Sequence, residues 1–440
     1  LDGFSPARNP AMWSAELMRI LAGKAAPGAR LATWSVAAEV RKNLDAAGFQ
    51  VEKRAGFGAK REMLVGGWTG LGSAPGRAPA SIAIVGAGLA GTSLAQRLAE
   101  RGLHVSLFDA RPALAMEASG NPVGVFRPRL ARDDNRAARF SRAAFLYAMH
   151  HWDRLAAAGH NPRWLSCGVV QIARDDAEAQ KWHEILADYP AEYIQALAGE
   201  EIERLTGQKL GGYRVSLGGW MSPPSLCSVQ IASQAARIET RLAVEIAAIE
   251  PCPSGWRLSL RNQPGALEFG TVILANANQV TRFAPRLPLQ AVRGQLSYLP
   301  GGTLPALGQV FAREGYVTPA VDGVHVLGAS YDADDISAQP HAQSHADNLQ
   351  RLAGLLPGWE KQFSADKLQG RVAFRATTPD RLPIIGALAP GLYVYTGLGS
   401  RGIVWSALGG ELLACQITGE ALPVEQDLVA AVSPLRFHQR

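Results

Sequence analysis

The sequence predicts an α/β protein with more than one domain, and three observations lead to this prediction. Residues 14–66 alternate between helical and strand-like patterns. Residues 67–80 are rich in glycine, alanine and proline, which is the composition of a linker. From Ser81 an apolar strand runs into a glycine turn, a helix and a second strand. The 440 residues leave room for two or three domains.

The elements before the linker read as the end of an α/β domain. "SAELMRILAGK" (14–24) has helical periodicity with Ser14 as its N-cap, and "ARLATWS" is strand-like. "AAEVRKNLDAAGF" predicts a helix that ends at Gly48, and the next residues predict a hairpin. We therefore interpret residues 1–66 as the C-terminal fragment of such a domain.

Composition narrows the class of protein. Hydrophobic residues make up 47% of the chain and charged residues 19%, which favours large buried cores over disorder. The net charge of +6 suits a polyanionic partner, although many enzymes share it. Neither a signal-peptide pattern nor a run of about 18 apolar residues occurs, so we expect a cytoplasmic protein without a membrane segment. The four scattered cysteines predict reduced thiols rather than disulfides or zinc ligands.

A dinucleotide fingerprint opens the second part of the chain. Gly86, Gly88 and Gly91 form G-x-G-x-x-G directly after the strand Ile82–Val85. The first glycine makes the tight turn, the second admits a pyrophosphate, and the third lets the helix pack on the strand. Asp109 ends the next strand, where its carboxylate can accept hydrogen bonds from ribose hydroxyls and would repel the 2′-phosphate of NADP. The other residues predicted to line this site are Ala87, Leu89, Ala90 and Ala110.

The motifs after the fingerprint are widely dispersed: "ASGNPVG" (118–124), "VILANA" (272–277) and "GLGSRGI" (397–403). This dispersal resembles FAD enzymes of the D-amino-acid oxidase and glycine oxidase type, in which segments from both chain ends clamp one FAD. The resemblance implies an FAD-binding Rossmann-like domain (about 81–160, 225–290 and 368–440) and an antiparallel-sheet substrate domain (about 161–224 and 291–367). It places Ser119, Gly120, Asn121 and Gly124 by the flavin and pyrophosphate, Ala275 and Asn276 near the phosphates, and Gly399, Ser400, Arg401, Gly402 and Ile403 over the pyrimidine end of the ring.

Two arginines are candidates for substrate binding. "RVAFRATTPDRLPIIG" (371–386) resembles the glycine-oxidase stretch in which Arg375 would bind the substrate carboxylate, with Arg401 as a second arginine beside the ring. A guanidinium can hold a carboxylate bidentately. Alternatively, both arginines are structural and pair with Asp380 or with carbonyl groups. No catalytic base is required, because a neutral amine can lose hydride to a correctly oriented flavin.

Two further patterns have competing interpretations. His341 and His345 have i, i+4 spacing, but no third ligand is evident, so we predict a solvated helix and no metal site. The six arginines between Arg127 and Arg142 either form a solvated helix face, interleaved with Asp133 and Asp134, or contact RNA phosphates.

Nine stretches along the chain carry a more specific resemblance to the family of bifunctional tRNA 5-methylaminomethyl-2-thiouridine biosynthesis proteins. In that family a methyltransferase domain precedes an FAD-dependent oxidoreductase. The stretches include "LDGFSPARNPAMW", "GFGAKREML", "GGWMSPPSLC", "VRGQLSYLP", "GYVTP", "LGASY" and "RATTPDRLPIIG". The resemblance implies that Asp2 is an acidic residue of the methyltransferase site. The glycine loop for S-adenosylmethionine is not among residues 1–66, so we expect methyl transfer only in a full-length protein.

The resemblance also implies a substrate and a reaction. The substrate is the anticodon wobble uridine of tRNA carrying a carboxymethylaminomethyl group, in effect an N-substituted glycine. Oxidation of its C–N bond and hydrolysis would yield aminomethyl-uridine and glyoxylate, and we expect a monomer. Two alternatives are an oxidase of free glycine, sarcosine or D-amino acids, and a tRNA-binding module with a vestigial flavin site.

The placement of the cysteines predicts non-covalent FAD. None of the four lies in 371–386 or 397–403, and no histidine flanks the fingerprint. Acid precipitation of the purified yellow protein should therefore release the flavin into the supernatant. Flavin colour that stays with the pellet would contradict this expectation.

Overall fold

The computed structural model describes residues 1, 3–25, 28–56, 60–68, 81–187, 189–262 and 264–437. The chain divides into two compact units, one formed by Leu1–Pro79 with Cys415–Pro423 and the other by Ala80–Ala414 with Val424–Arg440. Asp2 and residues 69–80 of the expected linker lie outside the described residues.

The first unit contains the helices and strands that its sequence patterns predict and, in addition, the 3-10 helix η1, which they do not predict. They are η1 (Pro10–Trp13), α1 (Ala15–Lys24), β1 (Arg30–Thr33), α2 (Ala38–Ala46), β2 (Phe49–Ala55) and β3 (Glu62–Trp68). The Oγ of Ser14 accepts a hydrogen bond from the Leu17 N–H at 3.2 Å, which confirms the predicted N-cap. The strands form an antiparallel sheet in the order β1-β3-β2, so the predicted hairpin is also confirmed. Both helices pack on this sheet around the buried side chains Met18, Val40, Leu44 and Leu64.

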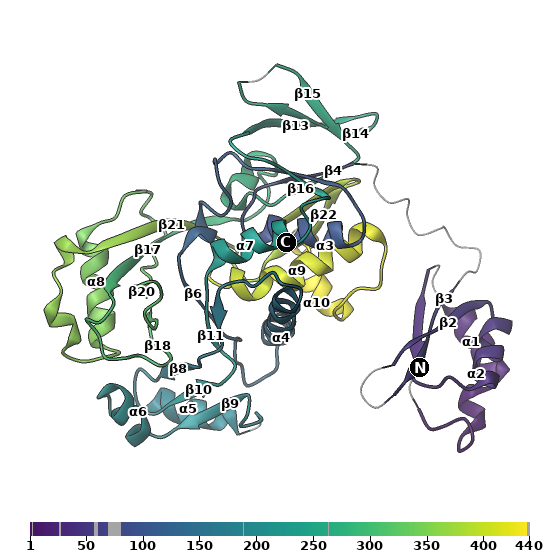
Figure 1. The fold of residues 1–440 in the computed structure, drawn as a ribbon, viewed down its shortest axis with the longest axis horizontal. Coiled ribbons are helices and arrows are strands. Elements are labelled where there is room, and N and C mark those ends of the chain that lie inside the picture. The colour runs from purple at the N-terminus through teal and green to yellow at the C-terminus, as the bar shows by residue number, and fades with distance from the viewer. Residues whose placement is uncertain are drawn as a thin grey trace. The chain divides into compact units, whose positions relative to one another are not determined.

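A six-stranded sheet forms the centre of the second unit. Its order is β12-β5-β4-β16-β23-β22, and only the β22–β23 pair is antiparallel. The strands are β4 (Ile82–Val85), β5 (Val105–Phe108), β12 (Ile238–Arg241), β16 (Thr271–Leu274), β22 (Ile384–Ala389) and β23 (Leu392–Thr396). β4 and β16 are buried throughout, as expected for parallel strands covered on both faces. The helices α3 (Leu89–Glu100), α7 (Pro223–Ala232) and α9 (Gly402–Thr418) lie beside the sheet (Figure 1).

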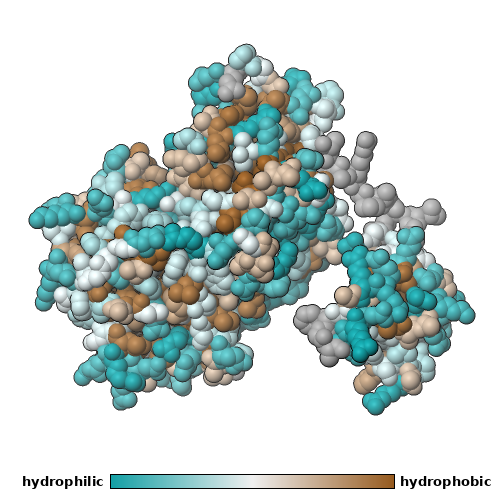
Figure 2. Space-filling model, viewed as in Figure 1, coloured by the Kyte–Doolittle hydropathy of each residue, from teal (hydrophilic) through white to brown (hydrophobic). Residues whose placement is uncertain are grey.

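A three-stranded antiparallel sheet lies against this core. It consists of β13 (Ile246–Cys252), β14 (Gly255–Leu260) and β15 (Ala266–Phe269). Partly buried Ile249, Trp256 and Leu267 pack onto the central hydrophobic cluster. In Figure 2 hydrophobic residues gather at the top of the larger body, where Figure 1 places this sheet.

The predicted substrate domain is built on an eight-stranded sheet of order β21-β17-β20-β19-β18-β8-β10-β9. All neighbouring strands are antiparallel except β8 and β18, so the sheet is antiparallel as predicted, apart from one pair. The strands are β8 (Val169–Ile172), β9 (Ile194–Leu197), β10 (Gly212–Val215), β17 (Gln290–Pro300), β18 (Val310–Ala312), β19 (Tyr316–Val317), β20 (Val324–Gly328) and β21 (Gln369–Thr377). β21 falls within the stretch 368–440 that the sequence assigns to FAD binding, yet it pairs along its length with β17 of this sheet.

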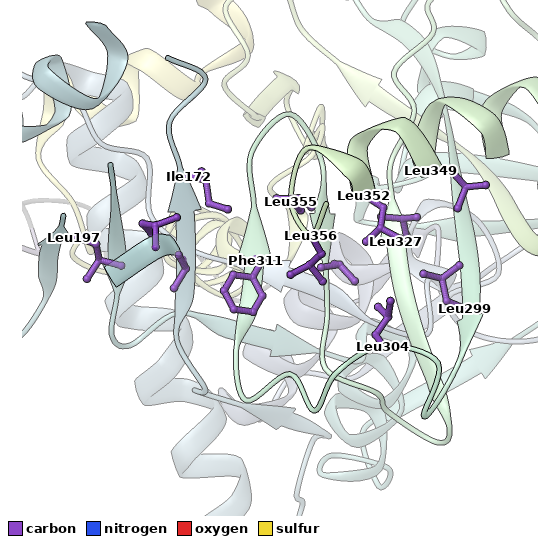
Figure 3. Close-up of a cluster of buried hydrophobic side chains, with 13 residues drawn as sticks. Ile172, Leu197, Leu299, Leu304, Phe311, Leu327, Leu349, Leu352, Leu355 and Leu356 are labelled. Atoms are coloured by element: carbon purple, nitrogen blue, oxygen red, sulfur yellow. The ribbon is translucent and has the colours of Figure 1, made fainter. Parts of the chain in front are cut away.

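Helices cover this sheet and close its core. α8 (Ala342–Ala353) places Leu349 and Leu352 against Leu299 and Leu327 of the sheet (Figure 3). The remaining elements of the unit are α4 (Arg136–Ala157), α5 (Asp176–Leu186), α6 (Gly199–Thr206), α10 (Gln426–Val432), the 3-10 helices η2 (Ala118–Gly120), η3 (Ala277–Arg282), η4 (Trp359–Gln362), η5 (Ala365–Lys367) and η6 (Pro434–Phe437), and a small sheet of β6 (Gly124–Phe126), β11 (Gly219–Met221) and β7 (Trp164–Leu165). Among the described residues, no helix combines the length and apolar character that crossing a bilayer requires.

The cluster in Figure 3 yields a stability prediction. Leu352 is fully buried, so Leu352→Ala should lower the free energy of unfolding by about 2–5 kcal/mol through lost burial and the cavity that remains. Leu205 lies in a helix of the same domain but is 37% exposed, so Leu205→Ala should cost less than about 1 kcal/mol. Urea denaturation measures both values, and equal losses in the two variants would contradict this account of the core.

Candidate active site

The glycine turn between β4 and α3 has no room for side chains. Gly86 has a φ of +112°, and a Cβ there would lie 2.5 Å from the carbonyl oxygen of Ala275. A Cβ on Gly88 would lie 2.9 Å from Ser119 Oγ, and one on Gly91 would overlap the carbonyl oxygen of Gly86. The turn therefore has the close backbone approach that a dinucleotide fingerprint requires.

Two helices begin at the same place. A Cβ on Gly402, the first residue of α9, would lie 3.5 Å from the Leu89 side chain at the start of α3. One turn further along, Ser93 Oγ donates to the carbonyl oxygen of Ser406 at 2.8 Å. The two helices thus run parallel and direct both positive N-terminal ends to one location. Free N–H groups and aligned dipoles at such a location attract anionic groups.

Asp109 lies at the end of β5, beside the fingerprint. Its Oδ2 accepts a hydrogen bond from the Ala87 N–H at 2.7 Å, and its Oδ1 accepts one from the Arg111 N–H at 2.8 Å. Burial raises the pKa of the Asp109 carboxyl, and the Ala87 hydrogen bond acts in the opposite direction. Asp109 therefore connects the end of β5 to the glycine turn, while the neighbouring Ala110 is exposed.

An arginine that the sequence analysis did not identify positions the loop 116–121. Arg371 of β21 donates to the carbonyl oxygens of Met116 and Glu117 at 2.6 and 2.5 Å, and to Asn121 Oδ1 at 3.0 Å. A Cβ on Gly120 would lie 2.5 Å from Arg371 Nη2, so the glycine makes room for the guanidinium. Arg371 precedes Arg375 by four residues on one strand. Because side chains separated by an even number of residues line the same face of a strand, this spacing could have identified Arg371 as a neighbour of Arg375 on that face.

The remaining predicted contacts also come together here. Gly124 packs against the Ile403 side chain, since a Cβ on Gly124 would lie 2.5 Å from Ile403 Cδ1. Gly399 has a φ of +53°, and its N–H donates to the carbonyl oxygen of Ala376 at 2.9 Å. Ser400 is exposed in the same turn.

An unsatisfied polar group supports the fit of a bound dinucleotide. Asn276 follows Ala275, the residue that touches Gly86. The Oδ1 atom of Asn276 is buried and has no hydrogen-bond partner among the described residues. A buried acceptor of this kind is costly unless a ligand or water donates to it. Together with the glycine cradle and the two helix ends, it makes the site suitable for FAD.

Arg375 lies on β21, and backbone carbonyl groups and tyrosine side chains are the neighbours of its guanidinium. Its Nη1 donates to the carbonyl oxygens of Ser330 at 3.2 Å and Arg293 at 3.5 Å, and no described carboxylate lies within ion-pair distance. A Cβ on Gly294 would lie 2.5 Å from Arg375 Cζ, so a missing side chain makes room for the guanidinium. Burial lowers the pKa of Arg375, while nearby tyrosines raise it. Asp380, the expected alternative partner, instead pairs with Arg436 at 2.7 Å.

Arg401 has a different surrounding. Its side chain makes no hydrogen bond or ion pair with any described residue. Burial and, after it, the positive charges of Arg127 and Arg129 lower the pKa of Arg401 to about 10. A buried cation without an acidic partner among the described residues could accept an anion.

The arginine-rich stretch divides into two groups. Downstream, Arg139 pairs with Asp427 at 2.8 Å and Arg142 with Asp134 at 2.7 Å. Arg132 and Arg136 have longer contacts, at 4.0 Å to Glu184 and 3.7 Å to Asp427. Arg127 and Arg129 pair with no described carboxylate. A solvated helix face therefore describes the downstream arginines, but it does not describe Arg127 and Arg129, the upstream pair.

The predicted solvated helix at His341 and His345 is only partly correct. His341 is the N-cap of α8, with Nε2 3.1 Å from Asp335 Oδ2. His345 is buried, and its Nδ1 lies 2.7 Å from Ser297 Oγ. The second histidine points into the core because it lies on the apolar face of α8.

Family comparisons divide the chain at the same place as the structure. Residues 81–416 match the family described as FAD dependent oxidoreductase, and residues 1–68 match the family described as S-adenosyl-L-methionine-dependent methyltransferase. The chain is 42% identical over 464 residues to the tRNA 5-methylaminomethyl-2-thiouridine biosynthesis bifunctional protein of Azoarcus sp. (strain BH72), covering 99% of this chain and 73% of that protein. It is 41% identical over 452 residues to the protein of that name from Thiobacillus denitrificans, covering 99% and 72%.

Solved structures share the fold of the larger unit. Glycine oxidase from Geobacillus kaustophilus aligns with a TM-score of 0.70 and 20% identity, covering 81% of this chain and 98% of that one. Iminodiacetate oxidase from Chelativorans sp. BNC1 aligns with a TM-score of 0.69 and 20% identity, covering 80% and 98%. The fold class predicted from the sequence is therefore confirmed.

The fingerprint geometry predicts the effect of one added methyl group. Gly91→Ala places a Cβ onto the Gly86 carbonyl oxygen, so α3 must move away from the turn and FAD binding should fall to a small fraction of wild type. Gly308→Ala is the matched control, because a Cβ there meets nothing within 4 Å. The ratio of flavin to protein absorbance measures the result. Wild-type flavin content in Gly91→Ala would show that this contact does not shape the cofactor site.

Proposed function

The chain belongs to the family of bifunctional tRNA 5-methylaminomethyl-2-thiouridine biosynthesis proteins, and we propose that its larger unit removes a carboxymethyl group from a modified wobble uridine of tRNA. The substrate would be 5-carboxymethylaminomethyl-(2-thio)uridine. The products would be 5-aminomethyl-(2-thio)uridine and glyoxylate. Membership in an FAD-dependent oxidoreductase family and the site geometry support this reaction class.

The observation that carries the proposal is the environment of Arg375. The residue is a partly buried cation without an acidic partner among the described residues, and its only hydrogen bonds there run from Nη1 to carbonyl oxygens at 3.2 and 3.5 Å. A guanidinium has five N–H donors, so most of them stay available to a ligand. A carboxylate fits this planar fork bidentately and would neutralise the charge.

The residues of the chain would orient the substrate rather than attack it. Bound FAD would supply the two-electron oxidation of the C–N bond. Arg375 would hold the carboxylate so that the neighbouring carbon faces the cofactor, and Arg401 would add a second positive charge. Loss of hydride from the carbon and of the proton from nitrogen leaves a substrate imine. Water then adds to the imine and releases the amine and glyoxylate.

The smaller unit suggests a second, later reaction. Residues 1–68 match an S-adenosyl-L-methionine-dependent methyltransferase family, so we propose that a protein with the complete domain methylates the amine product. For FAD we propose non-covalent binding. Cys227 is buried in α7, and burial raises the pKa of its thiol to about 12.

Nucleoside mass spectrometry provides the test. Purified flavoprotein is incubated with tRNA that carries the carboxymethylaminomethyl group, and the tRNA is digested and analysed. Loss of that nucleoside and formation of the aminomethyl nucleoside with glyoxylate are expected. Oxidation of glycine, sarcosine or D-amino acids, with the tRNA unchanged, would instead favour an oxidase of free amino acids.

Arg375→Ala tests the carboxylate contact. Truncation leaves the carboxylate in the site without its partner, which typically costs about 2–5 kcal/mol, so turnover at subsaturating tRNA should fall by roughly two to three orders of magnitude. Flavin absorbance should be retained. Arg375→Lys should restore little activity, because an ammonium group does not reproduce the planar fork.

Arg257→Ala is a control for loss of one arginine. Arg257 pairs with Glu268 on the exposed β14–β15 edge, so its removal should leave turnover near wild type. Near-wild-type turnover of Arg375→Ala with full flavin content would rule out the proposed carboxylate contact.

A further inference from the structure

We propose that Arg127, Arg129 and Arg381 surround Arg401 to form a binding site for an RNA backbone phosphate next to the substrate carboxylate. This inference rests on the proposed function, since the RNA is the tRNA that carries the substrate. It assigns the tRNA contact to the upstream pair of the arginine-rich stretch and separates that pair from the downstream arginines.

Three chain segments bring these arginines together. Arg127 follows β6, whose Gly124 touches Ile403 at the start of α9. Arg401 immediately precedes α9. Arg381 lies in the turn between β21 and β22, and Thr378 of this turn contacts Gly397, since a Cβ on Gly397 would lie 2.9 Å from Thr378 Cγ2.

Both residues of the upstream pair are anchored. Arg127 Nη1 donates to Tyr213 Oη at 3.1 Å, and the Tyr213 ring packs edge-on against Trp182 with centroids 4.7 Å apart. The backbone N–H of Arg129 donates to Ser141 Oγ of α4 at 2.8 Å. Because the phenol is a neutral partner, its hydrogen bond orients the Arg127 guanidinium without cancelling the charge.

None of the four arginines pairs with a carboxylate in the described part of the chain. The nearest acid in sequence to Arg381 is Asp380, which pairs with Arg436 at 2.7 Å. By contrast, Arg139 and Arg142 each have a carboxylate at 2.8 Å or less. These four arginines thus concentrate positive charge at a place where the described residues supply no carboxylate partner.

The electrostatics of Arg401 support this proximity. Beyond burial, the like charges of Arg127, Arg129 and Arg381 all lower the pKa of Arg401, which means that each of the three repels the Arg401 guanidinium. Such repulsion is relieved when an anion binds among them.

One carboxylate cannot neutralise the combined positive charge of these four arginines. The substrate carboxylate carries a single charge, and Arg375 lies on β21, outside this group. Arg127, Arg129 and Arg381 therefore remain for a second anion. A phosphodiester oxygen pair fits the arginine fork, and a wobble nucleotide carries a phosphate close to its base.

The double variant Arg127→Gln/Arg129→Gln tests the proposal, with Arg139→Gln/Arg142→Gln as the matched control from the same stretch. Both lose two charges, but the control residues already pair with carboxylates. Each is assayed for binding to the modified tRNA over a salt series, and for oxidation of that tRNA and of the corresponding phosphate-free nucleoside.

In the test variant, the slope of log affinity against log salt should fall by about 1 per arginine. The ratio of kcat/KM for tRNA to kcat/KM for nucleoside should fall at least about tenfold, which corresponds to about 1.4 kcal/mol of lost phosphate binding. The control should change neither quantity by as much.

Two outcomes would overturn the proposal. An unchanged salt slope and ratio would show that no phosphate binds there. An equal loss with tRNA and nucleoside would show that the arginines bind the carboxylate instead. If wild type binds tRNA in a manner that depends on Arg127 and Arg129 but leaves it unoxidised, the phosphate site stands and the proposed reaction fails.

Discussion

The contact between Gly91 and Gly86 is the constraint on which the rest of the site depends. With no side chain at either position, α3 approaches β4 so closely that its first N–H groups face the turn. α9 then packs parallel to α3 through Ser93 and Ser406, and its own N-terminus arrives at the same location. A fold that places two positive helix ends together favours an anionic ligand there, and a pyrophosphate has the charge that this location attracts.

β21 connects this cofactor site to the substrate domain. Arg371 and Arg375 lie four residues apart on it and so share one face of the strand. The first holds the loop 116–121 that borders the cofactor site, and the second donates only to backbone carbonyl oxygens among the described residues, which is why we propose it as the substrate-binding arginine. Because β21 pairs with β17 rather than with the central sheet, a movement of the substrate domain would carry both arginines along.

The arginines of the chain differ in whether a carboxylate neutralises their charge. Many surface arginines, including Arg139, Arg142 and Arg257, have carboxylate partners and contribute little to net surface potential. Arg127, Arg375 and Arg401 near the active site lack such partners among the described residues. The formal charge of +6 therefore understates the local field at the site, which is what an RNA substrate would encounter.

The sequence by itself determined the features that depend on neighbouring residues. The glycine turn, the cap at Ser14 and the helices and strands of residues 14–68 are set by local backbone sterics and periodicity, and the structure contains them. The family resemblance added the glycine-oxidase type of fold and the candidate role of Arg375 in binding the substrate carboxylate. Only the tertiary structure decided that Arg371 holds a loop 250 residues away, that His345 is buried, and that Arg127 and Arg129 lie near Arg401 while Arg139 pairs with Asp427. The reason is physical: periodicity predicts which way a side chain points, but its partner is set by strand pairing and helix packing between segments hundreds of residues apart.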